Sequence, residues 1–348
     1  MTMQGDGPTD VVRTVLLSWN NSDGGDYLGK NGTSSNGQTS VQSDSCTPMD
    51  PTTFLFAYSN DFAPDVINQA VIFYLKHYIS PHYTTFAAIR FDTKNEEEFE
   101  YPNSFGDVVS FVQSHLPDPT LGFASQDTGS DVLRMVDRFL DNTVVSVCGS
   151  KMIIFVKRYS NETEYSQIVA KMRRHHSYLT IFASTNPSGG YHPESLYEIA
   201  SKTNGLCAFD DDGNINMAIR YVESVANPYL LYAANPQISG NGRIQLSPLL
   251  VKSECIITMM MQDNEPMTVV QQVLLSWYNH NGDGQMGING TNSYGVVSGN
   301  HCVSVEFLTN VSYNLQLDYI YTDSHVRRVQ IRVHQRDPPI NYWVPYDN

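Results

Sequence analysis

The stretch KMIIFV, at Lys151–Val156, is a short apolar run of the kind that forms a buried strand. Three other runs share its character: FLFAYS at Phe54–Ser59, FAAIRFDT at Phe86–Thr93 and YLTIFAS at Tyr178–Ser184. A poorer candidate is EEEFEY at Glu96–Tyr101, where acidic residues interrupt the apolar pattern. We predict that each of these runs is a strand of one sheet.

Segments with helical spacing lie between these strands. Apolar residues recur every three or four positions from Ile67 to Tyr78 and from Val132 to Leu140, and a helix is expected over Glu162–His175. Ser104 is suited to cap the helix that follows it. Alternating strands and helices favour a doubly wound, mainly parallel α/β sheet, which we assign to residues 51–226.

The pattern changes from about Asn227 onward. VSVEF at Val303–Phe307, YNLQLDYIY at Tyr313–Tyr321 and RVQIRVH at Arg328–His334 alternate apolar and polar residues with a period of two. Turns rich in Asn, Gly and Ser separate them. This pattern predicts an antiparallel β-sandwich over residues 227–348.

The pentapeptide VLLSW occurs twice, at Val15–Trp19 and at Val273–Trp277. The match extends on both sides, so that Asn31 falls on Asn289 and, after a small gap, Cys46 falls on Cys302. Residues 1–50 therefore read as a partial copy of the sandwich that stops before its last strands. The first copy begins partway through the repeated unit, so we expect the chain to be cut from a longer repeat protein.

Half a sandwich exposes sheet edges and half a core, which isolated strands do not tolerate. An upstream segment, a neighbouring chain or the α/β domain of the same chain must cover the first copy. We favour a neighbouring copy, because head-to-tail contacts that do not close build filaments. The alternative is that the first copy folds back on its own chain.

Composition and the start of the chain favour an acidic, secreted protein. The chain has 21 Lys and Arg against 36 Asp and Glu, a net charge of −15, which argues against a nucleic-acid partner. No apolar run approaches the roughly 18 residues of a membrane helix. The first residues, MTMQGDGPTD, do not form a signal peptide and look like a mature start. Both copies keep N-G-T in a Gly- and Asn-rich loop where a glycan could sit. Candidate N-glycosylation sites are Asn20, Asn31, Asn161, Asn289 and Asn310.

An oxidising environment would allow disulfides among the five cysteines. Cys255 and Cys302 bracket sandwich strands, so we predict that they pair. Cys148 precedes the fourth predicted strand, KMIIFV, and Cys207 lies in the sixth, GLCAF at Gly205–Phe209, and we predict that these two form a second bond. This leaves Cys46 unpaired, or paired with another chain.

The order of elements in the middle of the chain resembles that of von Willebrand factor A domains. The resemblance implies a metal site at the carboxyl end of the sheet, with ligands from a D-x-S-x-S motif and from an Asp after the fourth strand. Here Ala57 replaces the first Asp, Ser59 keeps the first Ser, Asp61 holds the last position and Arg158 stands where the second Asp belongs. A divalent cation needs carboxylate oxygens as ligands, and a guanidinium group at the same position would repel it. We therefore expect no metal and no cofactor.

Other motifs do not support catalysis. NHNGDG at Asn279–Gly284 resembles the front of a calcium loop, but Gly290 occupies the position of the bidentate Glu, so we expect a hairpin. The G-x-x-x-x-G-K spacing that ends at Lys30 lacks the following Ser or Thr. G-x-S-x-G, H-E-x-x-H and C-x-x-C are absent from the sequence. We expect no enzyme activity.

The sequence favours an extracellular structural or adhesive repeat protein that makes protein–protein contacts, with other copies of itself or with another extracellular protein. It does not span a membrane in this interpretation, and it assembles into oligomers or filaments. The architecture loosely resembles nematode secreted proteins that join a degenerate A-type domain to a sandwich. The alternative is a secreted soluble receptor for a carbohydrate or small ligand.

Overall fold

The computed structural model describes residues 46–75, 79–221, 226–251, 254–263, 268–308, 311–338 and 343–347. The features below belong to the compact unit Ser45–Asn348. The partial sandwich copy predicted for residues 1–50, with Asn20 and Asn31, lies almost entirely outside the described residues.

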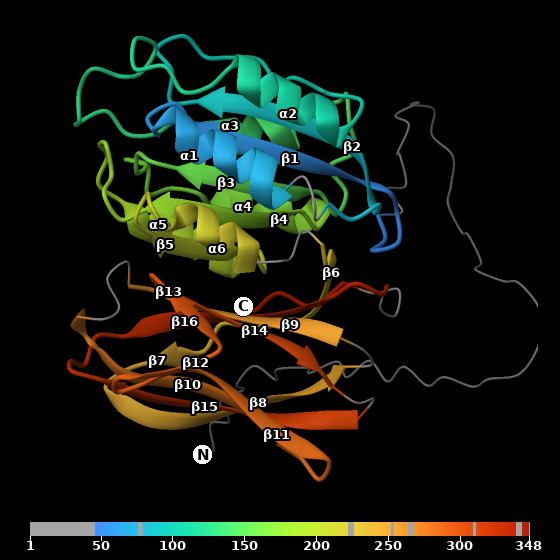
Figure 1. Ribbon diagram of the computed structural model, residues 1–348, viewed down its shortest axis with the longest axis vertical. Helices are drawn as coiled ribbons and strands as arrows, with labels where there is room; N and C mark the ends of the chain where they lie inside the picture. Colours follow the sequence, from blue (N-terminus) through green and yellow to red (C-terminus); the bar gives the residue numbers. More distant parts are fainter. Residues whose placement is uncertain are drawn as a thin grey trace, which may run out of the picture. The chain divides into compact units, whose positions relative to one another are not determined.

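The predicted α/β sheet is confirmed (Figure 1). Every ladder between its strands is parallel. Because the first strand lies inside the sheet, the chain builds outward in both directions from it, as in a doubly wound fold. The five strands follow the order β2-β1-β3-β4-β5, with bounds β1 Thr52–Ser59, β2 Tyr83–Phe91, β3 Lys151–Val156, β4 Tyr178–Ser184 and β5 Leu206–Asp210.

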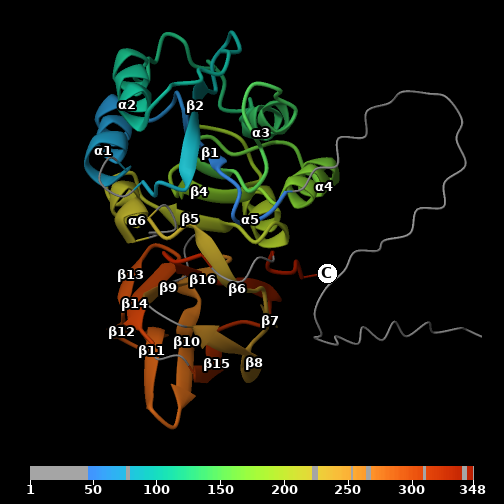
Figure 2. The same cartoon turned by 90° about the vertical axis from the view of Figure 1, so that its right-hand side faces the viewer.

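Helices cover both faces of this sheet. Figure 2 shows α1, α2 and α6 on one side, with α3, α4 and α5 on the other. Ser104 caps α2 as predicted, since its hydroxyl accepts the Asp107 N–H at 3.2 Å. The helical segments are α1 Pro64–Gln69, η1 Ala70–Leu75 (a π-helix), α2 Phe105–Ser114, α3 Val132–Leu140, α4 Ser166–His175, α5 Pro193–Lys202 and α6 Ile215–Tyr221.

Two predicted elements differ from the structure. The helix expected over Glu162–His175 begins at Ser166. Glu96–Tyr101 is not a strand, and Glu100 alone makes an antiparallel bridge, to Ala88 on β2. Three acidic side chains of this segment instead pair with Arg90, Arg134 and Arg138. Because arginines hold these charged side chains outside the sheet, the segment has no apolar face to bury as a strand would.

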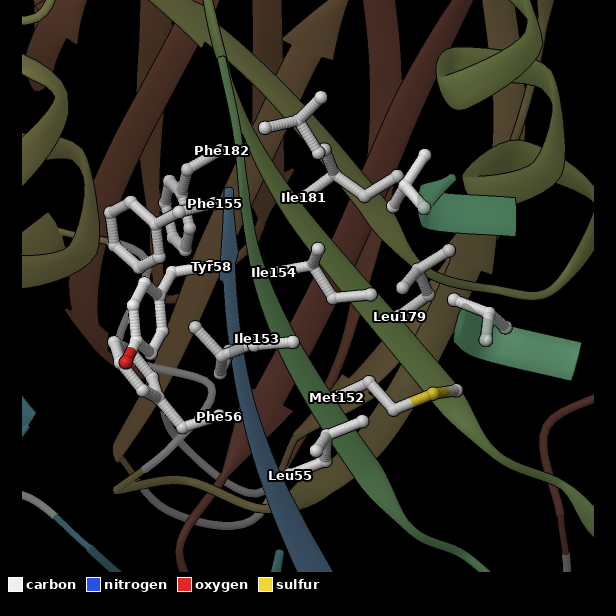
Figure 3. Packing of buried hydrophobic residues seen from close by; sticks show 14 of the residues in the cluster. Leu55, Phe56, Tyr58, Met152, Ile153, Ile154, Phe155, Leu179, Ile181 and Phe182 are labelled. Carbon is white, nitrogen blue, oxygen red and sulfur yellow. The ribbon is translucent and has the colours of Figure 1, made fainter. Parts of the chain in front are cut away.

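The core of the α/β part is fully buried and sorted by side-chain type. All residues of β1 and β3 are buried, which explains their continuous apolar runs. Figure 3 shows the labelled aromatic rings on one face of the sheet, together with Ile153, and the other labelled aliphatic side chains on the opposite face. Phe155 stacks on Phe182 with ring centroids 5.3 Å apart. The aromatic set is Phe56, Tyr58, Phe155 and Phe182, and the aliphatic set includes Met152, Ile154, Leu179 and Ile181.

The predicted antiparallel sandwich is also confirmed. One sheet has the order β12-β11-β10-β15-β8, and the other has β13-β14-β9-β16-β6 with β7 paired to β16. The strands are β6 Tyr229–Ala234, β7 Gln237–Ile238, β8 Asn241–Val251, β9 Glu254–Met261, β10 Val270–Asn279, β11 Gly282–Asn289, β12 Asn292–Tyr294, β13 Val296–Ser298, β14 His301–Phe307, β15 Val311–Tyr321 and β16 Arg327–Gln335.

The second VLLSW segment lies in β10, between β11 and β15. Val273, Leu275 and Trp277 are buried in the sandwich core with exposed fractions of at most 1%. Leu274 and Ser276 face the other way, because successive strand residues alternate between faces. A strand with this sequence therefore needs a neighbour on each side and an apolar layer beneath it.

The polar side of β16 is buried rather than exposed. Gln330 and Arg332 have no exposed surface, and His334 is 4% exposed. The hydroxyl of Tyr197, on α5, donates to the Met260 carbonyl oxygen at 2.7 Å. The alternation of β16 therefore separates two buried surfaces, one facing the sandwich core and one facing the α/β part.

The same junction covers the edge of the parallel sheet. On β5, the Cys207 N–H donates to Gln330 Oε1 at 2.9 Å and the Phe209 N–H donates to Asn300 Oδ1 at 2.6 Å. Asn300 Nδ2 donates back to the Cys207 carbonyl oxygen at 3.1 Å. Side chains thus satisfy an edge that would otherwise be free to pair with another strand.

Candidate functional site

The position where an open α/β sheet binds ligands is the carboxyl end of its strands, at the point where the chain reverses direction. In this sheet the reversal lies between β1 and β3, since β2 is on one side of β1 and β3 on the other. Ser59 ends β1, Asp61 follows it, and Arg158 comes two residues after β3. The residues predicted from the sequence therefore meet at this edge.

Arg158 fills this position with its guanidinium group. Its side chain is 3% exposed, and Nε donates to Asp61 Oδ2 at 2.8 Å. Nη1 donates to the carbonyl oxygens of Ser125 at 2.8 Å and Thr128 at 2.7 Å. Ser188 donates a further hydrogen bond to the Asp61 carboxylate. The loop around residues 125–128 is thus tied over a buried ion pair.

A second buried carboxylate, Asp92, lies beside this pair at the end of β2. The Ser59 hydroxyl donates to Asp92 Oδ2 at 2.5 Å, and the Ser130 hydroxyl donates to Oδ1 at 2.7 Å. Burial raises the pKa of Asp92 well above its usual range, while the hydrogen bonds from Ser130 and Ser59 act in the opposite direction. Ser59 therefore serves as a hydrogen-bond donor to the protein's own carboxylate.

These residues do not fit a divalent metal ion. Ala57 lies fully buried in β1 and offers no side-chain oxygen. Arg158 brings a positive charge to the one remaining carboxylate of the motif, Asp61. Within the described ranges, no group of three or more His, Cys, Asp and Glu side chains could hold a metal.

Asp92 was missed by the sequence analysis. FAAIRFDT was recognised as a strand, but the Asp at its end was not considered as part of the site. The available signal was its place, because the carboxyl ends of parallel strands meet at one edge. Its backbone has φ 62°, in a region that Asp tolerates better than most residues.

A second set of buried charges lies at the junction with the sandwich. Burial lowers the pKa of Lys151 to about 7 and that of Arg332 to about 10, and lowers that of His334 well below its usual value. Arg332 donates to the Ala234 carbonyl oxygen at 3.0 Å and to Asn235 Oδ1 at 2.8 Å. In the described part of the chain, no ion pair with a carboxylate forms at any of these three bases.

The predicted disulfide between Cys148 and Cys207 is wrong. Cys46 bonds to Cys148 with a Cα–Cα distance of 5.6 Å, so Cys46 is neither free nor available to another chain. Cys207 lies opposite Ile181 on β4, which lies opposite Ile154 on β3. Two strand spacings of about 4.8 Å each thus separate Cys207 from β3, beyond the roughly 7 Å limit for a disulfide.

The predicted pair Cys255 and Cys302 is wrong as well, and both thiols are free and buried. Cys302 lies opposite Met259, whereas Cys255 lies opposite Glu306. Four residues along β9 separate the two positions, about 13 Å at the rise of a strand. Cys255 and Cys302 lie on neighbouring strands, but at different positions along the ladder between β9 and β14.

Two of the predicted glycosylation sites are described. Asn289 is exposed at the end of β11, and Asn161 is exposed, with Nδ2 donating to the Asp127 carbonyl oxygen at 2.8 Å. Asn310 lies outside the described residues. NHNGDG forms the predicted hairpin, since Asn279 and Gly282 are paired across the turn between β10 and β11.

A protein-family model matches only part of the chain. A model described as "Domain of unknown function (DUF7154)" matches residues 234–336, which cover the sandwich from the last residue of β6 to just past β16. No curated protein matches the chain. The described helices include none long and apolar enough to cross a membrane.

Solved structures similar to the chain include von Willebrand factor A domains. A von Willebrand factor type A protein from Catenulispora acidiphila has a TM-score of 0.37 and 10% identity, over 84% of this chain and 59% of that one. The SpRpn10 VWA domain has a TM-score of 0.35 and 12% identity, over 50% and 96%. Proximal thread matrix protein 1 from the mussel byssus has a TM-score of 0.34 and 9% identity, over 56% and 51%. The chain spans less than two thirds of the first and third of these structures.

Proposed function

We propose that this protein is an extracellular structural or adhesive protein that makes protein–protein contacts without a metal ion. The observation that supports the proposal is the buried ion pair of Arg158 with Asp61, at the residues where the resemblance to A domains implies a metal site. A guanidinium that is fixed to the chain cannot coordinate a partner's side chain as a metal ion does. Contacts must then come from protein surfaces.

The contacts that join distant parts of the described chain suit a structural role. The buried bonds of Gln330 and Asn300 to β5 join the α/β part to the sandwich. The Trp343 Nε1–H donates to the Cys46 carbonyl oxygen at 3.1 Å, so the end of the described chain is held beside its beginning. The disulfide of Cys46 and Cys148 supports an oxidising, extracellular location.

We further propose that contacts between copies involve the first VLLSW segment. This segment lies outside the described residues, so the argument rests on its counterpart, β10. Leu275 has no exposed surface, and its strand pairs with β15, for which residues 1–50 contain no equivalent. Another copy of the chain could supply such strands, and contacts of this kind between copies would build oligomers or filaments.

The test is the oligomeric state of the full chain, measured by light scattering on a sizing column over a range of concentrations. Leu17 corresponds to Leu275, so Leu17→Asp is expected to convert oligomers into monomers. Ser18 corresponds to the half-buried Ser276 on the opposite face, so the matched control Ser18→Asp is expected to keep the oligomers. A wild-type chain that stays monomeric at every concentration would contradict the proposal.

The alternative is a soluble receptor for a carbohydrate. One observation favours it: a hollow of about 730 Å³ on the outer face of the sandwich, lined by polar side chains that include Gln272 and Gln285. A monomeric chain that binds an oligosaccharide at this face would support the receptor instead.

A further inference from the structure

The outer face of the sheet β12-β11-β10-β15-β8 carries rows of side chains that register fixes in place. Residues directly opposite each other in an antiparallel pair lie on the same face. One row therefore joins Asn289, Gln272, Ile320 and Asn241, which are paired in succession across four strands. The Asn of the N-G-T motif thus belongs to the same surface as the hollow that Gln272 and Ile320 line.

The next rows show what this surface can bind. Leu274 lies opposite Gly287 on β11 and Asp318 on β15. Gly287 has φ 126°, and a Cβ there would lie 2.1 Å from the Val273 carbonyl oxygen, so no side chain can cover Leu274 from this side. Leu274 is buried, with 8% of its surface exposed, whereas Ile320 is 37% exposed, so Ile320 supplies most of the exposed apolar surface of the hollow.

Three polar side chains around the hollow have no hydrogen-bond partner among the described residues. Among the described residues, the side chains of Gln272, Ser276 and Gln285 make no hydrogen bond, although all three line the hollow. The Arg243–Asp318 ion pair closes one side. Apolar patches bordered by amides and hydroxyls match a sugar, which presents C–H faces and a rim of hydroxyls. The volume of about 730 Å³ also falls within the range of about 300–1,000 Å³ that is typical of ligand sites.

The attachment point is open to modification. Asn289 and Thr291 are exposed in the turn between β11 and β12. A Cβ at Gly290, between them, would meet nothing within 4 Å. Asn289 lies opposite Gln272, two residues along β10 from Leu274, or about 7 Å at the rise of a strand. The first sugars of a glycan on Asn289 can therefore reach the hollow.

We propose that Asn289 carries an N-linked glycan whose first sugars pack on Ile320 and hydrogen-bond to Gln272 and Gln285. The glycan covers the outer face of the sandwich and leaves the other surfaces for contacts between proteins. This inference rests on the extracellular location proposed above, and it names the occupant of the hollow as the protein's own sugar.

The test uses the full chain, expressed with a secretion leader in insect cells so that glycosylation does not depend on the native route. Mass spectrometry of the glycopeptides is expected to find a glycan on Asn289. Thr291→Ala removes this site and keeps the Asn, and we expect it to lower Tm by about 2–4 °C. Thr163→Ala, the matched control, removes the Asn161 site in the α/β part and should shift Tm by less than about 1 °C.

A double substitution, Gln272→Ala with Gln285→Ala, separates packing from simple occupancy. It should lower Tm in the glycosylated protein and have little effect in the Thr291→Ala background, because the partner sugar is then absent. The proposal is overturned if Asn289 is unmodified in the secreted protein, or if the double substitution has the same effect in both backgrounds. Binding of free chitobiose to this face of the glycosylated protein would also overturn it, since a covered face cannot bind a second sugar.

The same samples keep the two proposals distinct. The sizing column reports self-association whether or not Asn289 is modified. A monomeric protein with a packed glycan on Asn289 would refute the assembly proposal alone. An oligomeric protein with an unmodified Asn289 would refute the glycan proposal alone.

Discussion

Arg158 and Arg332 are both buried arginines, but the protein accommodates them in opposite ways. Arg158 pairs with Asp61 at 2.8 Å, whereas Arg332 donates to the Ala234 carbonyl oxygen and to Asn235, with no carboxylate in salt-bridge range among the described residues. Burial lowers the pKa of Arg332 to about 10 and that of Lys151, in the same junction, to about 7. The comparison distinguishes a charge that the fold requires from charges that it tolerates.

The difference matters because removal of one partner of a buried ion pair leaves the other partner charged and unpaired. Removal of a lone buried cation leaves only carbonyl and amide groups, and it also removes the cost of keeping a charge away from water. The two regions should therefore respond differently to the same substitution.

The largest effect is expected for Arg158→Met, which leaves the Asp61 carboxylate without its cation and the carbonyl oxygens of Ser125 and Thr128 without this donor. We expect a loss of about 3–5 kcal/mol in the free energy of unfolding, measured by urea denaturation. The double variant Arg158→Met with Asp61→Leu should recover most of this loss. The exposed Arg134, changed to Ala, is the control and should cost less than about 0.5 kcal/mol. Equal losses in the single and double variants would show that the pair is not the source of the stability.

Lys151→Met is expected to act in the opposite direction and to stabilise the protein by about 2–4 kcal/mol near pH 7. Because the folded pKa of Lys151 is lowered to about 7 from 10.5, the unfolded chain binds more protons between these values. The stability of the wild type should therefore rise from pH 7 towards pH 10.5, and the advantage of the variant should shrink over the same range. Thermal unfolding of both proteins at several pH values measures this, and a gap that is constant with pH would contradict the buried-base account.

The smallest of the substitution effects is expected for Arg332→Met. The lost hydrogen bonds to Ala234 and Asn235 and the relieved burial of a charge offset each other, so the free energy of unfolding should change by less than about 1.5 kcal/mol. Urea denaturation of this variant beside Arg158→Met gives the comparison directly. A loss as large as that of Arg158→Met would mean that Asp347, which accepts hydrogen bonds from Asn235 at 2.8 Å, makes the junction an ion-pair network.

Much of the fold could be predicted from local patterns. The apolar runs that include KMIIFV and FLFAYS became the central strands, because a sheet buried on both faces needs apolar residues at every position. The alternating segments became sandwich strands, because a strand that faces the sandwich core on one side needs apolar residues only at every second position. The strand predicted over Glu96–Tyr101 is wrong, because the acidic side chains of this segment pair with arginines outside the sheet.

The junction and the disulfide could not be predicted, because both depend on positions far apart in sequence. Gln330 looks like a solvent-facing residue of an alternating strand, and only the packing of α5 and β5 against β16 shows that it is buried. Cys148 pairs with Cys46 because the chain entering β1 passes its loop, which no spacing reveals. Arg158, in contrast, could be placed from element order alone, since it follows a recognised strand by two residues.

The most direct test of the central claim, that Arg158 takes the place of a metal ion, is the thermal unfolding of the wild-type protein with and without divalent cations. We predict that Tm in excess EDTA equals Tm in calcium, magnesium or manganese to within about 1 °C. A bound ion at about 100 times its Kd would add about 2.7 kcal/mol to the folded state and raise Tm by several degrees. Such an increase, abolished by Asp61→Asn, would show that a metal binds beside Arg158 and would contradict the account.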